Sequence, residues 1–182
     1  MSRLAGRAAP ATLALIAALA GPRTLAAQPA RERLDGFQEM RFGMSIDQAR
    51  QTLGATARAG SKKIAGGRTL AMLVAKASFE GQALAATYVF GNGDRLALVH
   101  LFPPSLLMST DEAACTGWGK QMVATLTKKF GSSDTTRGGT ANKSTVYRFK
   151  DGNEITLAAY LSPLICVAAL QFATPEARDG KY

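Results

Sequence analysis

The chain has 182 residues, of which 47% are apolar, and its 22 Lys and Arg against 13 Asp and Glu give a formal net charge of +9. This composition is typical of a globular domain and excludes a collagen-like, low-complexity or intrinsically disordered chain. A single histidine and few carboxylates leave little material for acid–base or metal chemistry. We therefore expect a protein that is not an enzyme and that uses no metal and no cofactor.

The N-terminus has the pattern of an export signal. Arg3 and Arg7 precede an unbroken apolar run over residues 11–20, and small residues follow at 25–27. A secretory signal peptide has this order of basic, apolar and small residues. The apolar run is too short for a transmembrane helix, which needs about 20 residues. We expect residues 1–27 to be a signal peptide and 28–182 a single domain, periplasmic or secreted, which export separates from nucleic acid.

Two helices are predicted from their capping residues. Residues 45–48 (SIDQ) form a capping box, and the helix that follows ends at Gly54. Residues 109–112 (STDE) form a second capping box, which opens a longer helix ending at Phe130 and Gly131. One side of this longer helix is apolar, with Cys115, Trp118, Met122 and Leu126 at helical spacing.

One hairpin pattern occurs twice. Residues 88–98 (YVFGNGDRLAL) recur 59 positions later as residues 147–157 (YRFKDGNEITL), each with a glycine in the turn. A three-residue turn with a glycine bulge keeps the alternation in phase across both hairpins. This register predicts one core face with Tyr88, Leu98 and His100, and it places Lys150 opposite Glu154.

Two further strands are predicted, at about residues 70–79 and 164–172. A Gly/Ala-rich stretch around Arg58 to Arg68 and the polar residues 132–142 are expected to be loops. The order of helices and hairpins predicts an α+β fold, in which tandem helix–antiparallel-strand units form one sheet with helices on one face. The half-repeats are roughly residues 34–104 and 109–174.

The two cysteines are predicted to pair. Cys115 and Cys166 are the only thiols, and an oxidising compartment favours a disulfide between them. No neighbouring base or C-x-x-C spacing indicates a reactive cysteine.

The segment from Phe42 to Gly54 (FGMSIDQARQTLG) resembles the helix-entry signature of small bacterial envelope domains. These are the SmpA/OmlA accessory lipoproteins of outer-membrane barrel assembly and the β-lactamase-inhibitor-protein-like fold. The resemblance implies a short helix followed by an antiparallel sheet, and in the inhibitor-type members two such units in tandem. The chain lacks the lipid-bearing cysteine of the lipoproteins, and the resemblance assigns no target and no contact residues.

Two binding surfaces are expected. The sheet face away from the helices is predicted to be unusually apolar and to bind an envelope protein, as an inhibitor or assembly accessory, through Val89, Val99, Leu101, Tyr160 and Val167. Alternatively, residues 34–42 cover this face, or two copies pair through it. A second hypothesis is a basic module for anionic ligands such as lipopolysaccharide, other lipids or cell-wall polymer, which would use Lys128, Lys129, Arg137, Lys143, Arg148 and Lys150.

Overall fold

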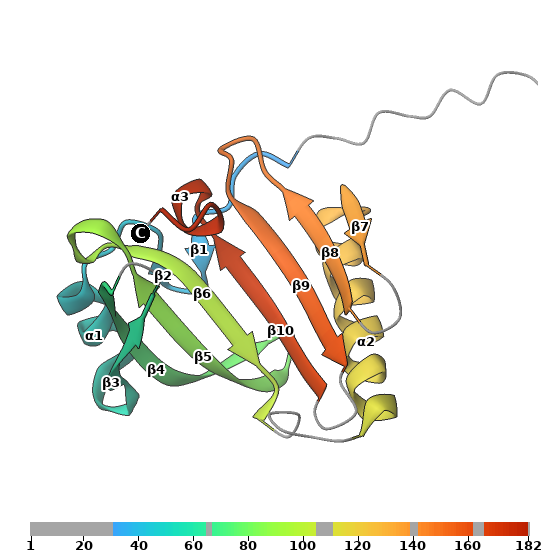
Figure 1. Ribbon diagram of the computed structural model, residues 1–182, viewed down its shortest axis with the longest axis horizontal. Helices are drawn as coiled ribbons and strands as arrows, with labels where there is room; N and C mark the ends of the chain where they lie inside the picture. The colour runs from blue at the N-terminus through green and yellow to red at the C-terminus, as the bar shows by residue number, and fades with distance from the viewer. Residues whose placement is uncertain (1–30, 65–66, 105–110, 139–141, 162–165, 182) are drawn as a thin grey trace, which may run out of the picture.

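The computed structural model describes residues 31–64, 67–104, 111–138, 142–161 and 166–181, and it is mostly β (Figure 1). Eight antiparallel strands form one sheet in the order β3-β4-β5-β6-β10-β9-β8-β7. A separate hairpin pairs β1 (Gly36–Phe37) with β2 (Met40–Arg41). The sheet strands are β3 (Arg58–Lys63), β4 (Thr69–Phe79), β5 (Gln82–Phe90), β6 (Leu96–Phe102), β7 (Thr135–Arg137), β8 (Asn142–Arg148), β9 (Glu154–Leu161) and β10 (Cys166–Ala173).

The predicted α+β fold of tandem helix–strand units with helices on one face is wrong. The regions expected to be loops contribute the edge strands β3 and β7, so strands dominate and helices are few. The two repeated hairpins also occupy different positions in the sheet. Two strands, β3 and β4, lie between the β5–β6 hairpin and its edge of the sheet, whereas a single strand, β7, lies between the β8–β9 hairpin and the other edge. The repeat in the sequence is therefore a repeat of hairpins and does not define two equivalent units.

Both predicted hairpins form, but the turn of the second lies at residues 150–152, one residue earlier than the expected 151–153. Asn92, Gly93 and Asp94 connect β5 to β6, and Gly93 takes the positive φ of 66° that glycine adopts without strain. In the second hairpin Arg148, rather than Lys150, lies opposite Glu154. The side chain of Lys150 instead pairs with Glu32 at 2.7 Å.

The helix α1 (Ile46–Leu53) begins and ends as predicted. The Gln48 backbone N–H donates to Ser45 Oγ at 3.3 Å, and the Ser45 N–H donates to Gln48 Oε1 at 2.9 Å, which completes the capping box. Gly54 follows as the C-cap. The helix packs against β4 and contributes the fully buried Ala49 to the core.

Replacing Ser45 by Ala is expected to lower the free energy of unfolding by about 1 kcal/mol, because the N–H of Gln48 loses its acceptor. Chemical denaturation measures the change. Gln51→Ala on the exposed side of the same helix is the control and should change stability by less than about 0.5 kcal/mol. Equal effects of the two substitutions would contradict the capping role.

The long helix α2 (Glu112–Phe130) begins differently from the prediction. Asp111 is its N-cap and accepts a hydrogen bond from the Ala114 N–H at 2.9 Å, whereas Ser109 lies outside the described residues. The predicted apolar stripe is buried, and the helix packs against β9 and β10. A short helix, α3 (Pro175–Arg178), packs against β6 and β10. Within the described ranges, no helix combines the length and hydropathy that crossing a bilayer requires.

The main core lies between the sheet and α2. Residues 34–42, which we expected could cover the opposite face, contribute Leu34, Phe37 and Met40 to this core. The ring of Phe37 lies 5.2 Å from that of Phe172 on β10 and 6.2 Å from that of Phe79 on β4. This cluster of three rings joins the N-terminal segment to both halves of the sheet.

A bulge in β6 reverses the predicted alternation of that strand. Phe90 pairs with Leu96, but Val89 pairs with Leu98, so Ala97 is an extra residue. An extra residue sends every later side chain to the opposite face. Val99 therefore faces α2, while Leu98 joins a second cluster with Ala177 of α3. Because α3 packs on the face opposite the main core, helices lie on both sides of the sheet.

Candidate functional site

The candidate site is the sheet face opposite α2, called here the outer face, which is turned toward the viewer in Figure 1. Side chains paired across neighbouring strands share a face, so the register identifies its members. At one end, α3 covers Val89 and Leu98. Away from α3 the face carries apolar side chains on four strands, called here the apolar strip: Met72, Val74 (37% exposed), Ala85, Phe102, Val167 and Ala169. The row directly across the sheet from Val74 is polar, with Thr87, His100 and Gln171.

Basic side chains border this strip on both edges of the sheet. Arg58 and Lys62 of β3 pair with Val74 and Leu70 and so point to the outer face. Lys76 of β4 and Arg137 of β7 belong to the same face by their pairing. None of these four cations has a carboxylate within 4 Å among the residues that the structure describes.

Negative charge on this face is limited to one side chain in the described strands. Glu154 is the carboxylate, it is 7% exposed, and it lies 3.9 Å from the guanidinium groups of both Arg148 and Arg178. The acid is thus already paired. The outer face presents an apolar strip with an excess of positive charge along its margins.

The five predicted partner-binding residues do not lie on one surface. Val99 and Leu101 are fully buried on the α2 face, because the β6 bulge turned them inward. Val89 is on the outer face but is buried beneath α3. Val167 is half-buried on the outer face, and Tyr160 pairs with it along the backbone, although the Tyr160 side chain lies outside the described part.

The six predicted anion-binding residues are also separated. Lys129 on the last turn of α2 pairs with Glu80 at 2.9 Å, and Lys150 pairs with Glu32. By register Lys143 points toward α2 and Arg137 to the outer face, but the two residues line one pocket at the β7–β8 end of the sheet. The remaining two are Lys128, on the last turn of α2, and Arg148, which pairs with Glu154.

The sole histidine lies on the outer face, not on the core face predicted for it. His100 is opposite Thr87 of β5 and Gln171 of β10, and its ring contacts that of Phe102 at 5.7 Å. Its Nε2 is buried and has no hydrogen-bond partner among the residues that the structure describes. Burial lowers the pKa of His100 from 6.5 to about 4, and the charge of Lys62 acts in the same direction. The imidazole is therefore neutral at neutral pH.

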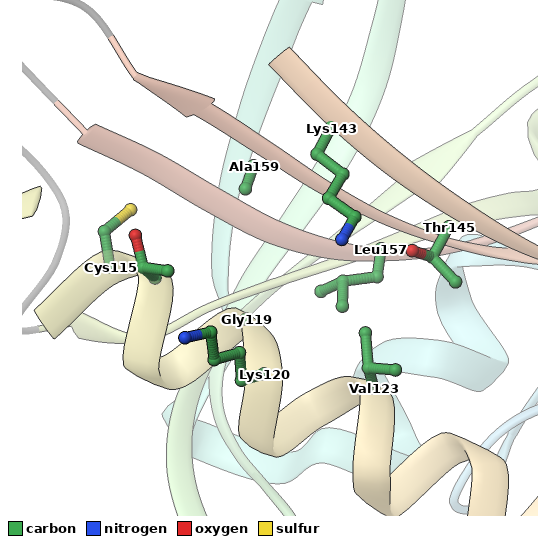
Figure 2. Close-up of a pocket in the computed structure, with 9 residues that line it drawn as sticks. Cys115, Gly119, Lys120, Val123, Lys143, Thr145, Leu157 and Ala159 are labelled. Carbon is green, nitrogen blue, oxygen red and sulfur yellow. The ribbon is translucent and has the colours of Figure 1, made fainter. Parts of the chain in front are cut away.

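A cavity of about 230 Å³ lies on the other side of the sheet, between α2 and the strands β8 and β9 (Figure 2). Its walls are largely apolar, with Val123 of α2 facing Leu157 of β9. Lys143 reaches from β8 toward the space between strands and helix, and Lys120 lines the helix side. The hydroxyl-bearing Thr145 is 4% exposed there.

The predicted disulfide remains a prediction. Cys115 is fully buried on the first turns of α2 and is not a free thiol. Cys166 opens β10, but its side chain lies outside the described part. The predicted signal peptide, residues 1–27, lies outside it as well.

A search of the described ranges finds no group of three or more His, Cys, Asp or Glu arranged to hold a metal ion. Comparison with known proteins gives no match: no family model, curated protein or solved structure is similar to this chain.

Sequence reasoning missed Arg58, Lys62 and Lys76 as site residues. The alternation of residues 69–79 contains enough information to place Lys76 on the same face as Val74. Arg58 and Lys62 carry no comparable signal, because β3 (RAGSKK) has no apolar alternation. Only its pairing with β4 shows which face they occupy.

Proposed function

We propose that the protein is an exported, non-enzymatic binding module that uses its outer face to bind an acidic region of an envelope protein, as an inhibitor or an assembly accessory. The observation that carries this proposal is the apolar strip bordered by Arg58, Lys62, Lys76 and Arg137, four cations that have no carboxylate within 4 Å among the described residues. Export is proposed from the basic and apolar pattern of residues 1–27.

The strip and its margins have the composition of a protein-binding surface. Such interfaces combine an apolar centre, which excludes water, with a polar rim that remains solvated. The half-buried Ala85, Phe102 and Ala169, which follow one another across β5, β6 and β10, supply the centre. The cations at the margins supply the rim. Because no described carboxylate pairs with them, they can pair with those of a partner. A partner with acidic residues around an apolar patch satisfies both parts.

The test replaces two apolar positions of the strip by carboxylates. Val74→Glu together with Val167→Glu should abolish retention of the partner, because the added charges are buried against apolar contacts and repel its acids. The measurement is affinity capture from envelope extract, comparing the wild-type and variant proteins on the same support. A partner protein should be retained at moderate salt by the wild type alone.

The matched control adds the same two charges elsewhere. Gln121→Glu with Ala124→Glu places them on the exposed side of α2, and capture should be unchanged. A carbodiimide, which couples amines directly to carboxylates, should join Lys62 or Lys76 to Asp or Glu of the captured protein. Equal retention by the Val74/Val167 variant would overturn the proposal. Salt-dependent release of glycolipid or cell-wall fragments alone would instead favour the anionic-ligand hypothesis.

A further inference from the structure

The cavity behind β8 and β9 has features of a ligand site that the outer face does not explain. It lies between α2 and the sheet, open to solvent on one side, on the side opposite the proposed protein-binding surface (Figure 2). Val123, Leu157 and Ala159 form its apolar walls. Apolar walls of this kind, combined with a few polar groups, are typical of small-molecule sites.

Two lysines from facing elements give the cavity its charge. Lys120 belongs to α2 and Lys143 to β8, both are exposed, and both line the cavity. In the part of the chain that the structure describes, neither ammonium group has a carboxylate within 4 Å. Within the described residues the positive charge at the cavity is therefore uncompensated, and it is complementary to an anionic group.

A helical glycine enlarges the same cavity. Gly119 lies in the interior of α2, where glycine costs about 1 kcal/mol relative to alanine. Apart from the neighbouring residues and the backbone of α2 itself, no heavy atom of the described residues lies within 4 Å of the Cβ that another residue would have at this position. Close packing within the chain therefore does not require glycine here. Its effect is to leave room beside the apolar walls.

We propose that this cavity binds a single-chain anionic amphiphile, such as a fatty acid. The acyl chain lies along Val123 and Leu157, and the carboxylate lies between the ammonium groups of Lys120 and Lys143. The absence of a side chain at Gly119 makes room for the acyl chain.

The probe is decanoate, kept below its aggregation concentration and titrated into the protein by calorimetry. Gly119→Leu should weaken binding by on the order of tenfold or more, since its side chain occupies the cavity. The same substitution should leave the thermal stability equal or higher, because leucine is the better helix former. Loss of affinity without loss of stability separates a filled cavity from an unfolded variant.

Gly117→Leu is the matched control. Gly117 is exposed on the same helix, does not line the cavity, and also has no heavy atom within 4 Å of its missing Cβ. This variant should bind decanoate like the wild type. Equal loss of affinity in both variants, or unchanged affinity in Gly119→Leu, would overturn the proposal, as would absence of binding to the wild type.

A second pair of variants tests the charge. Lys143→Gln should weaken decanoate binding several-fold and reduce its dependence on salt, while binding of uncharged decanol stays the same. Lys128→Gln, on an exposed turn of α2 outside the cavity, should affect neither ligand. Equal affinity of the wild type for decanoate and decanol would contradict the anionic part of the proposal. These outcomes are independent of capture by the outer face.

Discussion

Replacing Phe172 by Ala is expected to lower the free energy of unfolding by about 3–5 kcal/mol, the usual cost of removing a buried aromatic ring. The ring is 3% exposed and contacts those of Phe37 and Phe79 at 5.2 and 6.2 Å. These contacts hold the N-terminal segment and β4 against β10, which is central in the sheet. Urea denaturation at neutral pH measures the loss.

Phe102→Ala is the control for this prediction. It removes the same ring from the neighbouring strand, but Phe102 is half-buried on the outer face, so the loss should be clearly smaller. If the two substitutions lower the free energy of unfolding by the same amount, the cluster of Phe37, Phe79 and Phe172 is not a major source of the stability of the core.

Acidification is expected to destabilise the protein through His100. Its pKa is about 4 in the folded protein, where burial is the main cause, against 6.5 for an unburied histidine. Below pH 6.5 the unfolded chain therefore binds a proton that the folded chain does not. The contribution of His100 to the free energy of unfolding is fully present above pH 6.5, decreases as the pH falls, and is lost by about pH 4. The whole contribution is about 3 kcal/mol.

The His100→Gln variant isolates this contribution from that of the carboxylates. Its free energy of unfolding, measured by urea denaturation between pH 7 and pH 4, should fall less steeply than that of the wild type. NMR titration of the imidazole should give a pKa well below 6.5. An ordinary histidine pKa, or parallel stability curves for the two proteins, would show that the imidazole is solvated in the folded state.

The helix ends and turns could be predicted because their signals are local. The capping box of Ser45 and Gln48 joins residues three apart, and Gly54 and Gly131 stop their helices one residue after the end. The hairpin turn at residues 92–94 likewise depends on its own residues. Such interactions form within a few positions of the chain, whatever the rest of the fold does.

The faces of the strands could be predicted only in part. In β9 the alternation held, and Ile155 and Leu157 are buried as expected. In β6 one extra residue, Ala97, turned Val99 inward and His100 outward. A bulge is stabilised by the neighbouring strand and the surrounding packing, so the alternation of β6 by itself carries no sign of it. For this reason two of the predicted partner-binding residues, Val99 and Leu101, are buried in the core, whereas Val89 is covered by α3.

The sequence by itself determined the composition class, two helices with their C-terminal ends, and the two hairpin turns, because these depend on residue content and on contacts between near neighbours. Only the tertiary structure decided the eight-stranded order, the edge strands β3 and β7, and the placement of α3 across from α2. Strand pairing joins residues far apart in the chain, as in β6 with β10. That pairing brings Arg58, Lys62, Lys76 and Arg137 to the margins of one apolar face, and this arrangement has no signature in the local sequence.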